Sequence, residues 1–139
     1  STPTSGKKED MGKCLEFVKS YTSHINAVSS LVTTLPHGDV AASIGGTDGK
    51  IKFYDVRTFD VSGMIATSQK FMGCKACFIG SDQSLLAVST ESGAILIYSS
   101  VTLSSKPVSK ITLHAAFITA MKYNYKCETV ISCDEKGIV

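Results

Sequence analysis

The sequence predicts an all-β protein built from a repeated unit of several short strands. Two observations carry this prediction. Short segments alternate between apolar and polar residues, as half-buried strands do. Glycines also recur at a fixed interval: Gly49, Gly93 and Gly137 are each 44 residues apart, and an apolar segment stands on both sides of each.

The pattern is clearest around the Asp48-Gly49 pair. Such a pair favours a tight turn with positive φ, and apolar side chains alternate with polar ones over the segment 50–54 that follows it. The apolar segment 40–44 suits the partner strand. The same arrangement returns over 85–98 and begins again at 130–139, which indicates an internal repeat of hairpins.

Units of about 40–45 residues with several strands each are typical of propeller blades. We therefore expect a fragment of a β-propeller, with four-stranded antiparallel blades repeating every ~44 residues. Its expected divisions are a flexible connection at 1–12 and a partial propeller at 13–139. Within the latter, 13–69 holds the outer strand of one blade and the first full repeat, 70–113 the second repeat, and 114–139 a truncated third.

Each expected strand is a run of about five residues bounded by turn residues. Leu15 and Phe17 alternate with polar neighbours and indicate the first strand, while Pro36 and Gly38 mark the loop after the second. The expected strands are 14–21, 25–31, 40–44, 50–54, 64–69, 74–79, 85–89, 94–98, 107–113, 118–123 and 130–133.

Composition excludes several classes of function. The 139 residues include 14 Lys and Arg and 12 acids, a net charge of +2, and no run of five or six like charges. This argues against direct binding of nucleic acid or an acidic membrane. The longest apolar run, 94–98, is too short to span a bilayer. We find no signal or transit peptide, and because the chain does not begin with Met we expect Ser1 to be a cut end.

Five cysteines are an odd number without the density of a disulfide scaffold, so we expect reduced thiols in an intracellular reducing compartment. Cys74 and Cys77 form a C-x-x-C, which could indicate a redox pair or half of a zinc site. They fall on an expected strand, and no second ligand pair has matching spacing. We expect buried, inert cysteines.

Four residues of the first repeat, His24, Ser43, Asp48 and Tyr54, suit a buried hydrogen-bond network, because an imidazole can bridge a carboxylate and a hydroxyl. With Asp55 after Tyr54, the repeat resembles the WD40 family, with Tyr where that family usually has Trp.

The other two repeats match the pattern less completely. The third has His114, Ser132 and either Asp134 or Glu135. The second has no His before Cys74 and keeps mainly Tyr98, so it should hold a weaker network.

Several segments are similar to the WD-repeat region of cyclophilin-fused WD-repeat proteins: Leu15 to Lys19 before a Ser-His turn, Cys74, the run 93–99, and the segment from Leu113 to Ile138. This resemblance implies a nuclear, splicing-associated protein. It also implies a peptidyl-prolyl isomerase domain outside this chain.

No catalytic motif such as a Walker loop or Gly-x-Ser-x-Gly is present. His24 and His114 occupy repeated positions, which indicates an architectural role, and His37 lies in an exposed loop. Phe71, Met72, His114 and Phe117 lie in or beside connections between units. They could be anchors for a protein partner or could be buried between blades.

We therefore expect a non-catalytic scaffold that uses no cofactor or metal. It would bind protein partners, spliceosomal ones by the resemblance, and the remaining blades of its own propeller. The alternatives are an adaptor unrelated to isomerases and a fragment that positions substrate for a missing catalytic domain. A piece this short leaves sheet faces and strand edges exposed, so we expect the isolated chain to associate.

Overall fold

A computed structural model describes residues 14–139, and the flexible connection expected at 1–12 lies outside them. The described residues form ten strands. These are β1 (Val28–Thr33), β2 (Val40–Gly45), β3 (Lys50–Asp55), β4 (Asp60–Ala66), β5 (Ala76–Ile79), β6 (Leu85–Ser89), β7 (Ala94–Ser99), β8 (Ser109–Thr112), β9 (Ile118–Asn124) and β10 (Thr129–Asp134). The expected all-β class is confirmed.

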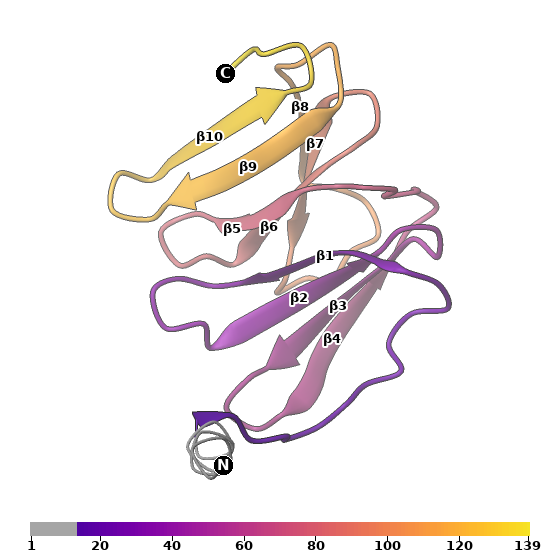
Figure 1. The fold of residues 1–139 in the computed structure, drawn as a ribbon, viewed down its shortest axis with the longest axis vertical. Coiled ribbons are helices and arrows are strands. Elements are labelled where there is room, and N and C mark those ends of the chain that lie inside the picture. The colour runs from indigo at the N-terminus through magenta and orange to yellow at the C-terminus, as the bar shows by residue number, and fades with distance from the viewer. Residues whose placement is uncertain (1–13) are drawn as a thin grey trace, which may run out of the picture.

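The strands form two four-stranded antiparallel sheets and one hairpin. The first sheet is β1-β2-β3-β4, the second is β5-β6-β7-β8, and β9 pairs with β10. Figure 1 shows them stacked in chain order, from the first sheet near the N-terminal end to the hairpin near the C-terminus. The first strands of the three units adjoin one another, because β1 contacts β5 and β5 contacts β9.

Glycines with positive φ lie in the turns between β2 and β3 and between β6 and β7, and in the turn after β10. Gly49, Gly93 and Gly137 have φ of 66°, 87° and 84°, in the left-handed region that a side chain disfavours. At Gly93 an added Cβ would lie 2.4 Å from the Ala116 carbonyl oxygen. Gly93 therefore combines a positive φ with a close approach of two backbone segments.

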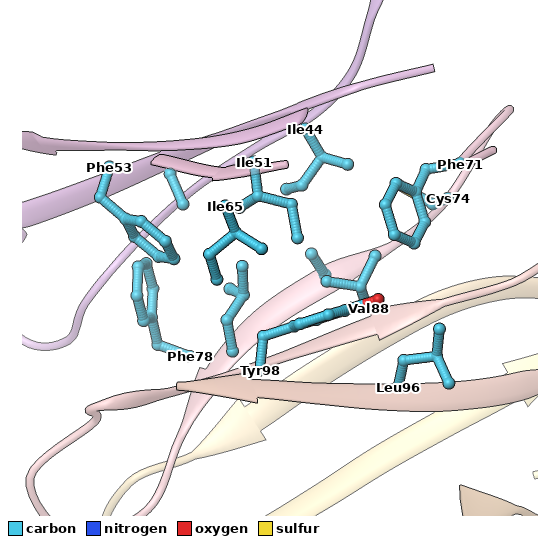
Figure 2. Packing of buried hydrophobic residues seen from close by; sticks show 13 residues of the cluster. Ile44, Ile51, Phe53, Ile65, Phe71, Cys74, Phe78, Val88, Leu96 and Tyr98 are labelled. Carbon is cyan, nitrogen blue, oxygen red and sulfur yellow. The ribbon is translucent and has the colours of Figure 1, made fainter. Parts of the chain in front are cut away.

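Apolar side chains fill the two spaces between neighbouring sheets. Between the first and second sheets, Phe53 packs against Phe78 with ring centroids 6.2 Å apart, and Phe71 meets Tyr98 edge-on at 6.4 Å. Figure 2 shows this cluster, with side chains from both sheets pointing toward one another. A second cluster, which includes Ile97 and Met121, joins the second sheet to the hairpin. Consecutive residues of β6 and β7 therefore belong to the two clusters in turn.

The expected fragment of a β-propeller is corrected here, although four-stranded antiparallel sheets of the expected kind are present. A propeller closes a ring of roughly four to eight four-stranded sheets. Residues 14–139 form separate antiparallel sheets, and none of the sheets closes on itself or with the others into a ring.

The outer strand expected at 14–21 is also wrong. No ladder partner lies along this segment, and Leu15 and Phe17 are exposed. The segment is held to the first sheet by side chains instead: Lys19 donates a hydrogen bond of 3.0 Å to the Phe59 carbonyl oxygen, and the Tyr21 hydroxyl donates to the same oxygen.

Within the described residues, no helix is long and apolar enough to cross a membrane.

Candidate functional site

Five polar side chains form a hydrogen-bonded chain around the first hairpin turn. His24 Nδ1 lies 2.9 Å from Asp48 Oδ2, and His24 Nε2 lies 2.7 Å from Ser43 Oγ. Ser43 Oγ is 2.8 Å from Tyr54 Oη, which is 2.6 Å from Ser23 Oγ. We call this set the His24 network. The structure brings together the four residues that the sequence analysis singled out and adds Ser23, whose only sequence signal is its place beside His24.

The turn itself positions Asp48. Its carboxylate accepts hydrogen bonds from the backbone N–H of Lys50 at 2.9 Å and of Ile25 at 3.3 Å. Burial opposes the charged form, but these bonds and the one from His24 outweigh it and lower the pKa of Asp48. Since a carboxylate only accepts, His24 must carry its proton on Nδ1. The network therefore ties the segment before β1 to the hairpin turn.

A second network of the same kind lies in the hairpin unit. His114 Nδ1 is 2.9 Å from Asp134 Oδ2, and His114 Nε2 is 2.8 Å from Ser132 Oγ. The backbone N–H of Ile138 donates to Asp134, and this bond is the main reason why the pKa of Asp134 is lowered. We call this set the His114 network. It resolves the choice between Asp134 and Glu135 in favour of Asp134.

The second sheet lacks such a network but has a tyrosine, Tyr98, at the place of Tyr54. Val88 has the place in the second sheet that Ser43 has in the first: Ser43 lies opposite Lys52, and Val88 lies opposite Leu96. Because Val88 has no hydroxyl, the buried Tyr98 Oη has no hydrogen-bond partner. Figure 2 shows Tyr98 beside Val88. Burial raises the pKa of the Tyr98 phenol.

Both networks have the connectivity of a Ser-His-Asp catalytic triad, so that chemistry must be weighed. A nucleophilic hydroxyl has to reach a substrate carbonyl. The Ser43 side chain is buried, and its oxygen contacts Tyr54 as well as His24. The arrangement also occurs twice. Both facts favour an architectural role, in which the histidines hold turns to the segments before the sheets.

An open apolar pocket adjoins the His24 network, on the face of the first sheet that turns away from the second. We call it the outer pocket; its volume is about 610 Å³. Its walls include Tyr21, Val28, Leu31, Tyr54, Val56 and Phe59, and Ser23 and Ser43 add hydroxyls. The sequence analysis missed it. The one available signal was Phe59, a large apolar residue inside a connection.

The remaining candidate residues separate by burial. Burial raises the pKa of the Cys74 thiol to about 12 and of the Cys77 thiol to about 11, so neither is a thiolate near neutral pH. Among residues 14–139 no group of three or more His, Cys, Asp or Glu could hold a metal ion. His37 is exposed and belongs to neither network. The C-x-x-C motif therefore lacks the thiolate character of a redox pair.

The four residues considered as partner anchors do not share one surface. Phe71 is fully buried against Tyr98, and His114 belongs to its network. Met72 is exposed, and Phe117 is partly buried close to Gly73. Two of the four are thus buried, and a role of Met72 and Phe117 as partner anchors stays a prediction.

Comparison with known proteins gives two curated relatives. The chain is 30% identical over 135 residues to the peptidyl-prolyl cis-trans isomerase CYP71 of Arabidopsis thaliana, covering 96% of this chain and 21% of that protein. It is 28% identical over 130 residues to the peptidyl-prolyl cis-trans isomerase cyp15 of Rhizopus delemar, covering 90% of this chain and 20% of that protein. The chain thus spans about a fifth of the length of these relatives. No protein-family model matches it.

These relatives correct the functional interpretation made from the sequence. The chain was expected to resemble a WD-repeat region, to act as a non-catalytic scaffold and to leave isomerase activity to a region outside it. Both relatives are named as isomerases, and the similarity extends over almost the whole of this chain. The expectations of a WD-repeat scaffold and of a non-enzymatic segment are therefore overturned. The nuclear location and the spliceosomal partners stay predictions.

Proposed function

We propose that this chain is part of a peptidyl-prolyl cis-trans isomerase and that the outer pocket receives the proline-containing segment of its substrate. The observation that carries the proposal is the similarity to two proteins named as isomerases, over 96% and 90% of the chain. The outer pocket supports it as the open apolar recess beside the buried network.

The reaction asks little covalent chemistry of the protein. Rotation about an X-Pro bond makes and breaks no bond, yet it takes tens to hundreds of seconds unaided because amide resonance must be lost. The planar amide is more polar than the twisted one. A site that removes water from the amide therefore raises the ground state relative to the twisted state. An apolar pocket is the feature that this mechanism requires.

The outer pocket has the size and lining for such a segment. Its volume of about 610 Å³ falls within the range of roughly 300–1,000 Å³ that is common for small-molecule sites. Tyr21 and Tyr54 lie with ring centroids 5.0 Å apart, and Phe59 completes an aromatic wall against which a proline ring can pack. The Tyr54 hydroxyl is fixed by the His24 network, so this wall is held in place.

An isomerase assay on the 139-residue chain tests the proposal. With a short X-Pro peptide, the chain should shorten the time to cis-trans equilibrium. Phe59→Ala should lower kcat/KM about tenfold or more, because it removes a wall of the pocket. Val101→Ala is the control, since Val101 is an exposed loop residue outside the pocket and should leave the rate unchanged.

Two results would contradict the proposal. If the peptide reaches equilibrium no faster with the chain than without it, this segment is not catalytic. If the peptide binds in the outer pocket but its rotation is not accelerated, the pocket is a binding site and not the isomerase site.

A further inference from the structure

Three positions with the same place in their units have very different surroundings. Leu31, Ala76 and Met121 lie on the first strand of each unit, directly opposite Ser43, Val88 and Ser132 respectively. Ala76 is 7% exposed and Met121 4%, because a neighbouring sheet covers each of them. Leu31 is 70% exposed. The first sheet therefore leaves Leu31 exposed where the other two units bury the corresponding residue, and we call the side of the first sheet that carries Leu31 the Leu31 face.

The opposite end of the stack has a matching open face. Ala42, Ala87 and Ile131 come directly before Ser43, Val88 and Ser132 on the second strands. Their side chains therefore point to the opposite face of each sheet. Ala42 is 0% exposed and Ala87 1%, whereas Ile131 is 56% exposed. Ile131 thus lies on an exposed face of the hairpin, with the partly exposed Cys133 on the same face. We call it the Ile131 face.

The two interfaces inside the chain show how such faces pack. In each, the face that carries Ala42 or Ala87 covers the face of the next unit that carries Ala76 or Met121. By its place on the strands, the Ile131 face corresponds to the faces that carry Ala42 and Ala87, and the Leu31 face corresponds to those that carry Ala76 and Met121. One chain cannot make this contact with itself, because the first sheet and the hairpin lie at opposite ends of the stack in Figure 1.

We infer that a second copy of this chain docks head to tail, with its Ile131 face on the Leu31 face of the first. This contact continues the internal packing by one more unit. It is heterologous, so each copy keeps one open face and further copies can add. The inference goes beyond the proposed isomerase activity. It also implies that docking and peptide binding exclude each other, since the Leu31 face contains the outer pocket.

A mixing experiment tests the inference. Leu31→Glu places a charge on one face, and Ile131→Glu places a charge on the other. By light scattering, the unchanged chain should show a mass that rises with concentration above 14.8 kDa. Each variant alone should remain a monomer. An equimolar mixture should form a dimer of twice that mass, because each variant contributes the intact face that the other lacks.

The controls separate this contact from unspecific association. Val101→Glu alters a residue that is 75% exposed on neither face and should associate like the unchanged chain. Circular dichroism checks that each variant is folded, and Leu31→Ser and Ile131→Ser replace any that is not. A monomeric unchanged chain, a variant that associates by itself, or a mixture that stays monomeric would each overturn the inference.

Discussion

His24 and His114 are held in the same way, each between a carboxylate and a serine hydroxyl. Almost no water reaches these side chains, since His24 and Asp48 are 1% and 2% exposed. A polar group in such a place is stabilising only while its partners are present, because a buried group left unpaired loses its hydration without compensation. The consequences can be tested one residue at a time.

Removing the imidazole should expose this dependence. His24→Ala leaves Asp48 and Ser43 without their partner, so we expect the free energy of unfolding to fall by about 1–3 kcal/mol. His37→Ala is the matched control, because His37 is exposed and should change it by less than about 0.5 kcal/mol. Urea denaturation measures both. Equal midpoints for the two variants would contradict a supporting role for the network.

The two repeated tyrosines should respond in opposite ways to loss of the hydroxyl. Tyr98 Oη is buried without a partner, so Tyr98→Phe should leave stability unchanged or raise it by about 1 kcal/mol. Tyr54 Oη contacts Ser43 and Ser23, so Tyr54→Phe should lower stability by about 1–2 kcal/mol. Thermal unfolding of both variants checks the pair. A lower Tm for Tyr98→Phe would mean that its hydroxyl has a partner.

Acid should weaken both networks through their carboxylates. Hydrogen bonds lower the pKa of Asp48 and Asp134 below the ordinary 3.8, so each carboxylate contributes stability at pH values above that figure. This contribution is lost as the pH falls below 3.8 and through the lowered values. We expect the urea midpoint of the unchanged chain to fall more between pH 5 and pH 3 than that of Asp48→Asn/Asp134→Asn. An equal fall would show that these groups do not link folding to pH.

At the scale of elements, strands between two covering layers were the easiest to predict. The expected segment 85–89 coincides with β6, and 94–98 differs from β7 by one residue. Both are almost continuously apolar because both faces are buried. β4 begins at Asp60, whereas the sequence suggested 64. Residues 60–63 pair with β3 but carry little apolar pattern. An edge strand can be held by backbone hydrogen bonds alone, and such pairing produces no alternation of apolar and polar side chains in the sequence.

The glycine turns should differ in how they tolerate a methyl group. Gly93 and Gly137 share a positive φ, but a Cβ at Gly93 would meet two backbone oxygens within 2.6 Å, whereas at Gly137 nothing lies within 4 Å. Gly137→Ala should cost about 1–2 kcal/mol for the left-handed conformation alone. Gly93→Ala should cost clearly more, because backbone must also move. Equal losses of Tm would mean that the close approach has no consequence.

At the scale of the whole molecule, the sequence could predict the all-β class and the residues of the His24 network. It could not predict how the sheets pack against one another. The sequence shows directly the 44-residue spacing and the positions of His24, Ser43, Asp48 and Tyr54. Whether sheets close into a ring depends on contacts between their faces, which no local pattern records. The outer pocket could not be found either, since Tyr21, Leu31 and Phe59 come from three segments that only the fold brings together.

Unequal covering of the sheets should also set how the molecule opens. The second sheet is covered on both faces, by the first sheet on one side and by the hairpin on the other, whereas the first sheet is covered on one. Amide hydrogens exchange by local opening, and opening is rarest where most apolar contacts must break. We therefore expect the slowest exchange in β7 and faster exchange in β3, although both are central strands of the same length.

Measuring amide exchange at a low and a high protein concentration provides the control. In dilute solution β3 should exchange faster than β7, because its other face opens onto the outer pocket. At concentrations where copies dock, the Leu31 face becomes covered, so protection should rise in β2 and β3 while β7 stays unchanged. Equal protection of β3 and β7 in dilute solution would contradict the view that stacking of sheets, and not pairing within each sheet, limits the stability of this molecule.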